Sequence, residues 1–343
     1  MADFHDQQPQ NPIEQFPIRK IWRDDLPPRL LEIPNKDIPA MLYVRGDQNL
    51  LYEQAVSLNP NTLGELPFRK LVSSRLLCVV GSRECTPYGK EVCEKLIAGL
   101  RGFPITIVSG LALGIDSIAH RAALSAGLKT VAVPGSGLDP SAIYPSNHAR
   151  LANEILAAGG CLISEFPPLE RARAYFFPQR NRIMAGLCHA TLIIEAEADS
   201  GTLITARLTL DYNRDLLAVP GSIFSDFSVS CHNLIRDGAT PITSSADLLQ
   251  ALGFEVESDE VRAEANNQYE NAAEKTPIDF SIRCPDVTSK ELILLEFLRR
   301  PKSRDQIFTT IDLPAAEINA TLSSLELKGW TEERGGELRL AKN

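Results

Sequence analysis

The order of apolar and helical segments between residues 76 and 219 constrains the fold of this chain more than any other feature. Six short runs rich in β-branched and aliphatic residues alternate there with longer helical patterns. The strand candidates are Leu76–Val80, Ile105–Val108, Thr130–Val133, Cys161–Ser164, Thr191–Ile194 and Leu216–Val219. The helical patterns between them include Tyr88–Leu100, Ile115–Ala126, Asn147–Ala158 and Thr202–Tyr212. This alternation predicts an α/β fold with a doubly wound, mostly parallel sheet covered on both faces.

Turns made of small residues follow five of the six strand candidates. They are Gly81-Ser82-Arg83, Ser109-Gly110, Gly135-Ser136-Gly137, Ser200-Gly201-Thr202 and Gly221-Ser222. All of these turns would lie at the carboxyl edge of the sheet, where α/β proteins bind ligands. Glycine lets a ligand approach the backbone, and free helix N–H groups favour anions. The sequence therefore predicts a site for phosphate groups at this edge.

Two common nucleotide motifs are absent from the sequence. Gly135-Ser136-Gly137 is followed by Leu138-Asp139-Pro140, so it is not the G-x-G-x-x-G of dinucleotide binding, and no G-x-x-x-x-G-K-[ST] occurs. We therefore expect neither a nucleotide cofactor nor nucleotide triphosphatase activity.

The segment 175–182 reads Tyr-Phe-Phe-Pro-Gln-Arg-Asn-Arg. Aromatic rings beside Arg and Asn supply stacking surfaces and phosphate donors, the combination that holds unpaired bases and their backbone. We expect one of the two Phe residues to be core. Arg180 and Arg182 lie two apart at a predicted helix start and cannot share a face, so at least one should point at the ligand edge. The binding candidates here are Tyr175, Phe177, Arg180, Asn181 and Arg182.

Candidate catalytic residues are few. Asp116 and His120 stand four apart, as a base and its orienting carboxylate could, but an Asp in a first helical turn more often stabilises the helix. Glu165, Glu195 and Glu197 lie near strand ends without a nucleophile, a base or a metal cluster beside them in the sequence. The sequence thus favours a binding protein over an enzyme and offers no catalytic residue.

Charge is distributed unevenly along the chain, whose net charge is −9. Residues 253–287 carry nine acidic and three basic side chains without apolar periodicity, whereas residues 71–252 carry 16 and 15. The first stretch is typical of a linker, and the second favours a local anion site over a broad basic face. We therefore expect an extension and lead-in segment (1–70), a binding domain (71–252), an acidic linker (253–287) and a C-terminal domain (288–343).

The C-terminal domain combines three helical patterns with a hairpin. The helices are expected at Ser289–Leu298, Arg304–Thr310 and Pro314–Leu327, and the hairpin at Trp330–Leu340. This order favours a winged-helix-like domain. Its third helix carries few cations, which favours protein contact or regulation over duplex binding.

The seven cysteines, at 78, 85, 93, 161, 188, 231 and 284, form no C-x-x-C pair. We expect reduced thiols and no metal. The amino-terminal residues are polar and Pro-rich, and no apolar run reaches membrane-spanning length. The sequence therefore predicts a cytoplasmic protein without a membrane partner.

A series of short motifs in fixed order resembles the DprA/Smf family, DNA processing protein A. The motifs are GSR (81–83), SG-x-x-x-GID-x-x-AH (109–120), PGSGLD-x-x-x-YP (134–145), SE-x-P (164–167), FP-x-RNRI-x-AGL (177–187), SGTLITA (200–206), AVPGS (218–222) and GA (238–239).

The resemblance implies an extended Rossmann domain that binds single-stranded DNA, loads the RecA recombinase during natural transformation and forms homodimers. It implies that Arg83 contacts the DNA backbone, with Ser109–Gly110, Arg180 and Arg182 nearby, and that an aromatic residue of 175–177 stacks on a base. It also places His232 and Ile235 at a protein interface, although Ile235 could equally be core. Some relatives carry a DNA-contacting Lys after Tyr144-Pro145, where this chain has Ser146.

Two other functions stay open from the sequence. One is a related Rossmann enzyme that cleaves nucleoside monophosphates, although the Glu that its signature places after the glycine turn is missing from Ser200-Gly201-Thr202 and the residues that follow. The other is a transcription factor that acts through the C-terminal domain.

Overall fold

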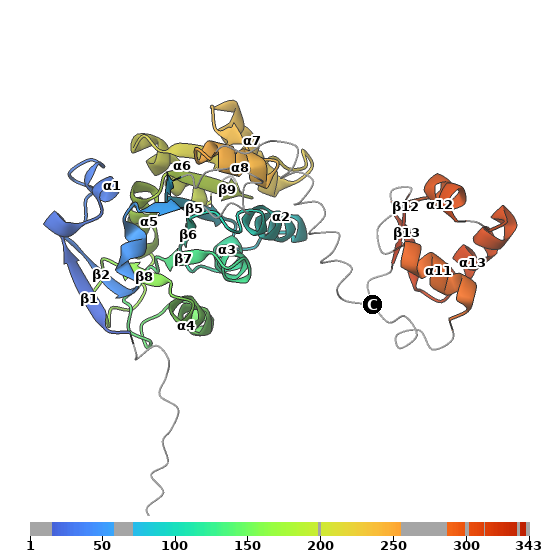
Figure 1. Cartoon of the computed structure of the whole chain (residues 1–343), viewed down its shortest axis with the longest axis horizontal. Helices are drawn as coiled ribbons and strands as arrows, with labels where there is room; N and C mark the ends of the chain where they lie inside the picture. The colour runs from blue at the N-terminus through green and yellow to red at the C-terminus, as the bar shows by residue number, and fades with distance from the viewer. Residues whose placement is uncertain are drawn as a thin grey trace, which may run out of the picture. The chain divides into compact units, whose positions relative to one another are not determined.

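The computed structural model describes residues 16–57, 71–197, 200–254, 287–298, 302–311, 313–334 and 337–340. The chain divides into two compact units, residues 1–266 and 267–343 (Figure 1). The division falls inside the predicted linker, and the domain limits expected at residues 70, 252 and 287 stay predictions.

The first unit is built on a nine-stranded sheet in the order β1-β2-β8-β7-β6-β5-β9-β10-β11. The seven strands from β8 to β11 are parallel, and β2 runs antiparallel to both β1 and β8. The bounds are β1 Ile18–Trp22, β2 Met41–Gly46, β5 Arg75–Gly81, β6 Ile105–Ser109, β7 Lys129–Ala132, β8 Cys161–Ser164, β9 Ala190–Ile194, β10 Asp215–Ala218 and β11 Thr240–Pro241. The predicted doubly wound, mostly parallel sheet is confirmed, and each of the six strand candidates matches a strand to within one residue.

Helices cover both faces of this sheet, as Figure 1 shows. They are α1 Pro28–Leu31, α2 Pro87–Ala98, α3 Ile115–Ser125, α4 Ala149–Ala157, α5 Phe176–Leu187, α6 Gly201–Asp211, α7 Asp226–Arg236 and α8 Ser245–Ala251. Successive residues of β5 face opposite layers, because side chains alternate along a strand. Leu76 and Cys78 pack in the core beneath α1, α5 and α6, whereas Leu77 and Val79 pack beneath α2, α3 and α8. Burial on both faces explains the nearly continuous apolar sequence of the strands.

The winding direction reverses between β5 and β9. From β5 the chain winds through β6 and β7 to β8 on one side, and from β9 through β10 to β11 on the other. The crossover connections therefore diverge above the carboxyl ends of β5 and β9, which end at Gly81 and Ile194. This point is where doubly wound folds bind ligands.

The lead-in segment contributes two strands to the sheet. The expected strand near residues 40–46 is present as β2, and Tyr43 pairs with Ser164 of β8. The sequence analysis did not predict β1, in which only Ile21 is buried among charged and partly exposed neighbours. Strands β3 (Ala55–Ser57) and β4 (Leu71–Ser73) pair antiparallel in a separate two-stranded sheet.

The second unit contains three helices and a three-stranded sheet. The elements are α11 Ser289–Phe297, β12 Lys302–Ser303, α12 Arg304–Thr310, α13 Ala315–Leu327, β13 Thr331–Arg334 and β14 Glu337–Leu340, with sheet order β12-β14-β13. Leu294, Ile307, Leu322 and Leu338 share one apolar core. The predicted helices and hairpin strands are all present, and the turn expected at residues 335–336 lies outside the described residues. The winged-helix assignment stays a prediction.

No helix among the described residues is long and apolar enough to cross a membrane. The six cysteines in the described part of the chain form no disulfide, and Cys284 lies outside it. Within the same residues, no group of three or more His, Cys, Asp or Glu side chains is placed to hold a metal ion.

Candidate nucleic-acid interface

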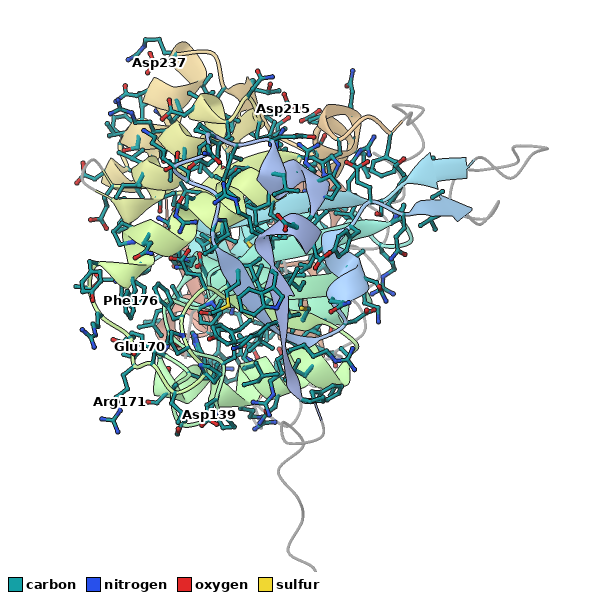
Figure 2. The ribbon with its side chains drawn as sticks, turned by 90° about the vertical axis from the view of Figure 1, so that its left-hand side faces the viewer. Asp139, Glu170, Arg171, Phe176, Asp215 and Asp237 are labelled. Carbon is teal, nitrogen blue, oxygen red and sulfur yellow. The ribbon has the colours of Figure 1, made fainter. Side chains whose placement is uncertain are left out.

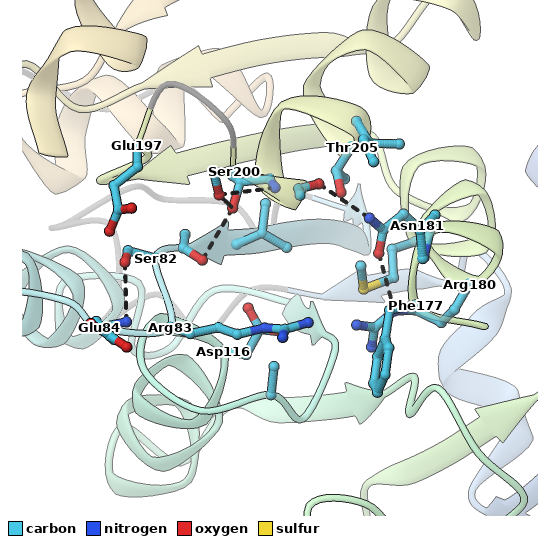
Figure 3. A pocket seen from close by; sticks show the side chains of 18 of the residues that line it. Ser82, Arg83, Glu84, Asp116, Phe177, Arg180, Asn181, Glu197, Ser200 and Thr205 are labelled. Atoms are coloured by element: carbon cyan, nitrogen blue, oxygen red, sulfur yellow. Dashed lines mark hydrogen bonds between the residues drawn. The ribbon is translucent and has the colours of Figure 1, made fainter. Parts of the chain in front are cut away.

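A cavity of about 580 Å³ opens at the carboxyl ends of β5 and β9. Its walls come from four segments: the end of β5 with the turn after it, residues 112–116 at the start of α3, residues 174–184 in and before α5, and Glu197 with residues 200–205 in the first turns of α6. Figure 3 shows Phe177, Arg180 and Asn181 on one side, Glu84 and Glu197 on the other, and Arg83 with Asp116 between them. The ligand edge predicted from the sequence thus contains a formed cavity.

The turn Gly81-Ser82-Arg83 packs closely against the end of β9 and the start of α3. The Ser82 amide donates to the Glu195 carbonyl at 2.8 Å, and the Ser82 carbonyl accepts from the Ile115 amide at 3.1 Å. A Cβ at Gly81 would lie 1.9 Å from the Ile194 carbonyl oxygen, so only glycine fits there. The backbone therefore fixes the direction in which the next residue leaves the turn.

The side chain of Arg83, the last residue of this turn, is exposed and lines the cavity. Its guanidinium lies 5.3 Å from the centre of the Phe177 ring. Among the described residues it forms no ion pair, so its donors are available to a ligand. A guanidinium beside an aromatic face offers a phosphate donor and a stacking surface together.

Arg180 has a different environment. Only 4% of the side chain is exposed, and Nη1 donates to the Gly110 carbonyl at 2.5 Å and to the Val133 carbonyl. Burial lowers the pKa of Arg180, and the nearby Asp116 carboxylate opposes that effect. Arg180 thus connects the turns after β6 and β7 from beneath the cavity.

Asp116 is the carboxylate that accompanies Arg180. It is 5% exposed and accepts a hydrogen bond from the Gly110 amide at 3.0 Å. Burial raises the pKa of Asp116, whereas Arg180 acts to lower it. These contacts are structural, and they use most of the hydrogen-bonding capacity of the carboxylate.

The charges in the cavity lining are nearly balanced. The lining holds three acids, Asp116, Glu84 and Glu197, against two Arg, so the cavity is not strongly basic.

Arg182 points away from the cavity. Its Nη2 forms an ion pair with Glu165, and its Nη1 donates to the Asp37 carbonyl at 2.9 Å. Burial raises the pKa of Glu165, and Arg182 counters it. Of the two arginines, Arg180 lines the cavity and Arg182 ties α5 to the lead-in segment.

The three aromatic residues of 175–177 also separate. Phe176 is 7% exposed and stacks on Phe166 with ring centres 3.8 Å apart, so it is the core residue of the pair. Phe177 lines the cavity. Tyr175 is 58% exposed outside it, with its hydroxyl 3.4 Å from Arg173. Figure 2 places Phe176 with Glu170, Arg171 and Asp139 along one side of the molecule.

The start of α6 supplies the remaining wall. Ser200 caps the helix by accepting from the Thr202 amide at 3.2 Å, and Thr202 donates its hydroxyl to the Gly81 carbonyl at 3.1 Å. Asn181 reaches the Gly201 carbonyl at 3.4 Å. Ser200, Gly201 and Thr202 therefore present a helix N-terminus, which favours anions, to the cavity.

The pair Asp116 and His120 cannot act on a ligand as acid and base. His120 is fully buried, its Nδ1 lies 2.7 Å from the Thr130 hydroxyl, and burial lowers its pKa to about 3. Glu195 is held by Thr86, whose amide donates to it at 2.8 Å. These residues have structural partners in place of a catalytic arrangement.

Comparison with known proteins relates this site to a family. The family model for DNA recombination-mediator protein A matches residues 62–253. DNA processing protein DprA of Streptococcus pneumoniae is 39% identical over 241 residues, which are 70% of this chain and 76% of that protein. The chain belongs to the DNA recombination-mediator protein A family.

Two solved structures from the DNA recombination-mediator protein A family share the fold. DprA of Streptococcus pneumoniae superposes with a TM-score of 0.59 at 37% identity, covering 71% of this chain and 76% of that chain. DNA processing protein A of Helicobacter pylori, described for its single-stranded DNA binding mode, has a TM-score of 0.55 at 27% identity, covering 69% and 95%. The resemblance to DprA/Smf proteins predicted from the sequence is confirmed.

Several motif residues of this chain lie outside the cavity lining and support it. Ser109 is buried and donates to the Val79 carbonyl at 2.6 Å, and Ser136 donates to Gly137 at 3.1 Å. A Cβ at Gly135 would lie 2.7 Å from Phe177, so this glycine makes room for the ring. The residues in this supporting group are Ser109, Gly110, Gly135, Ser136 and Gly137.

The two expected interface residues lie on α7, outside the cavity lining. Nε2 of half-buried His232 is 3.1 Å from the Gly221 carbonyl, and Ile235 packs partly buried against the core. In the preceding loop, Ile223 and Phe224 are 79% and 92% exposed. The sequence analysis missed this apolar pair, as it missed Glu84 on the cavity wall.

Proposed function

We propose that this chain binds single-stranded DNA at the cavity above β5 and β9, as a DNA-processing protein of recombination and natural transformation. The exposed Arg83 beside Phe177 carries the proposal, because this pair combines a phosphate donor with a ring at an established ligand position of the fold. Membership of the family and the DNA-binding structure of the Helicobacter pylori relative support it.

The arrangement suits an unpaired strand better than a duplex. Arg83 and the amides at the start of α6 would hold phosphate groups, and Phe177 would contact a base. A cavity with acids on one wall would repel the second backbone of a duplex. The sixteen residues predicted from the sequence therefore stay our proposed binding set, with Arg83, Phe177, Asn181 and Ser200–Thr202 in direct contact and the others in support.

Fluorescence anisotropy with an oligothymidylate and with a duplex of equal length tests this proposal. We expect tighter binding of the single strand, with log K falling by about one to two units per decade of salt, because each neutralised phosphate on a single strand contributes about 0.7. The slope is modest because Arg180 and Arg182 are engaged within the protein. Equal or tighter binding of the duplex would contradict the proposal.

We propose no catalytic role for the cavity. Nucleotide cleavage would need an activated nucleophile, and the described residues that line the cavity include no His, Cys or Lys to serve as one or to activate one, while the lining Asp116 is held by the Gly110 amide. This arrangement favours binding over the alternative of a nucleoside monophosphate hydrolase.

We also propose self-association as a homodimer and contact with the RecA recombinase through the surface of α7, which includes His232 and Ile235. The exposed Ile223 and Phe224 beside this helix support a protein contact, because large apolar side chains gather at interfaces. A partnership with the recombinase implies a cytoplasmic location.

The second unit is proposed as a protein-contact or regulatory domain. A chain that ends after Phe254 should keep single-strand affinity within about twofold, and residues 287–343 alone should bind DNA at least about a hundredfold more weakly. Two cations around α13 already have acidic partners: Lys328 lies 2.7 Å from Glu291, and Lys290 lies 2.6 Å from Glu317. Paired cations release few counterions from DNA.

The same anisotropy assay compares these two fragments with the full chain. Circular dichroism of each fragment serves as the control for folding. Tight duplex binding by the isolated second unit would instead favour the transcription-factor alternative.

A further inference from the structure

Tyr144 is an exposed aromatic residue next to the cavity that the proposed function does not use. It lies in the loop between β7 and α4 and is 51% exposed. Its ring centre is 5.8 Å from that of Phe177, with the two planes tilted by 55°. Since Phe177 in turn contacts Arg83, the three side chains form a row that leads out of the cavity.

The loop holds Tyr144 in a defined position. Its neighbours Ala142 and Ile143 are each 4% exposed, and their amides donate to the Asp139 carbonyl at 2.9 and 3.2 Å. On the other side, Nδ1 of buried His148 contacts the Leu111 carbonyl at 2.8 Å. An exposed ring between two anchored points loses little conformational freedom when a ligand binds.

The chemistry of the loop restricts what can bind there. Residues 133–149 contain no Lys or Arg and one acid, Asp139. Hydrogen bonds from Ser141 lower the pKa of Asp139, so this carboxylate stays charged near neutral pH and repels phosphates. The loop can therefore attract a nucleic acid through the face of its aromatic ring, and base stacking tolerates any sequence.

Ring geometry excludes a base between Tyr144 and Phe177. A base inserted between two rings needs those rings parallel and separated by two aromatic contacts, each of about 4.5–7 Å between ring centres. The observed rings are closer than this and tilted. A base would have to stack on the face of Tyr144 that points away from Phe177.

We propose that Tyr144 is a separate stacking site for single-stranded DNA, which receives the base of a nucleotide outside the cavity. This inference rests on the proposed function of the cavity. It assigns the loop after β7 a contribution that is independent of charge.

The test compares salt dependence as well as affinity. In anisotropy titrations with an oligothymidylate of about fifteen nucleotides, Tyr144→Ala should weaken binding about tenfold, the usual scale for one lost stacking contact. The slope of log K against log salt should stay that of the wild type, because no phosphate contact is lost. Tyr144→Phe should bind within about twofold of wild type.

Two further variants serve as controls for the position of the ring and for the charge of the loop. Trp22→Ala removes another exposed ring, 57% exposed on β1 at the far end of the sheet order, and should bind as the wild type does. Ser146→Lys adds a cation to the loop at an exposed position and should steepen the salt slope by about 0.7.

Wild-type affinity of Tyr144→Ala in a folded protein, or an unchanged slope for Ser146→Lys, would overturn the inference. Equal losses for Tyr144→Phe and Tyr144→Ala would also overturn it, because the hydroxyl would then be the contact. None of these outcomes would contradict binding of single-stranded DNA at the cavity. Failure of the wild type to bind single strands would instead reject the proposed function.

Discussion

Arg83→Glu should weaken binding of single-stranded DNA by at least about a hundredfold, the largest loss expected from any surface substitution. A hydrogen bond between charged groups contributes about 1.5–3 kcal/mol, and each 1.4 kcal/mol changes affinity tenfold. The substitution removes this contact and adds a carboxylate to a cavity that already holds Glu84, Glu197 and Asp116. Phosphates approaching the site would then meet repulsion with one remaining lining cation, the buried Arg180.

The fold should tolerate this change. Arg83 is exposed, and its contact among the described residues is the ring of Phe177. Exposed substitutions of this kind usually change the free energy of unfolding by less than about 0.5 kcal/mol. Equal thermal unfolding midpoints for variant and wild type would separate loss of the site from loss of structure.

Arg101→Glu is the matched control for charge. This residue is exposed in the turn after α2, where its guanidinium donates to the Ser125 carbonyl at the end of α3, near the amino edge of the sheet. The Arg101→Glu substitution makes the same change in net charge, but away from the carboxyl edge of the sheet. It should therefore leave the affinity for single-stranded DNA within about twofold of the wild type. If Arg83→Glu bound as tightly as Arg101→Glu, the cavity would not be the DNA site.

The sequence predicted the central sheet well because each strand is buried on both faces. A run such as Ile105–Ser109, in which every residue is buried, is recognisable without knowledge of its partners. Strand β1 lacks that signal. It pairs at the edge of the sheet with only Ile21 buried, so its charged sequence resembles a loop.

The sequence analysis assigned the binding turns to one edge of the sheet, but it could not assign a role to each residue at that edge. Topology places every turn after a parallel strand on the same side, so Gly81, Ser82 and Ser200–Thr202 could be grouped from the sequence. The contacts of Arg180 involve carbonyls 70 and 47 residues away in the chain. No local spacing distinguishes an arginine with such partners from its neighbour Arg182. The sequence analysis therefore named both as binding candidates.

Arg180→Met should be the most destabilising of the single substitutions considered for this site. Leaving a buried acceptor without its donor typically costs about 1–3 kcal/mol for each group, and a buried carboxylate nearby loses a compensating charge as well. Here the loss would leave the Gly110 and Val133 carbonyls without this donor and Asp116 without its cation. Methionine preserves the side chain's length and apolar bulk, so the effect reports the guanidinium. Urea denaturation of both proteins measures it.

A second substitution tests whether Asp116 is the source of that cost. Asp116→Asn removes the charge that Arg180 balances, so the double variant should be more stable than Arg180→Met alone. Destabilisation that is simply the sum of the two single changes would show that the pair is not coupled.

The pH dependence of Arg180→Met provides the independent check. Burial raises the pKa of Asp116 above its ordinary value of 3.8 in the folded protein, and loss of Arg180 removes an influence that lowers it. The folded variant would therefore bind a proton more readily than its unfolded chain. Its stability deficit should shrink as the pH falls from neutral through the raised pKa toward 3.8, where the carboxyl is neutral in the folded state and still charged in the unfolded one. A deficit that stayed constant over this range would mean that Arg180 stabilises the fold through the two carbonyls alone.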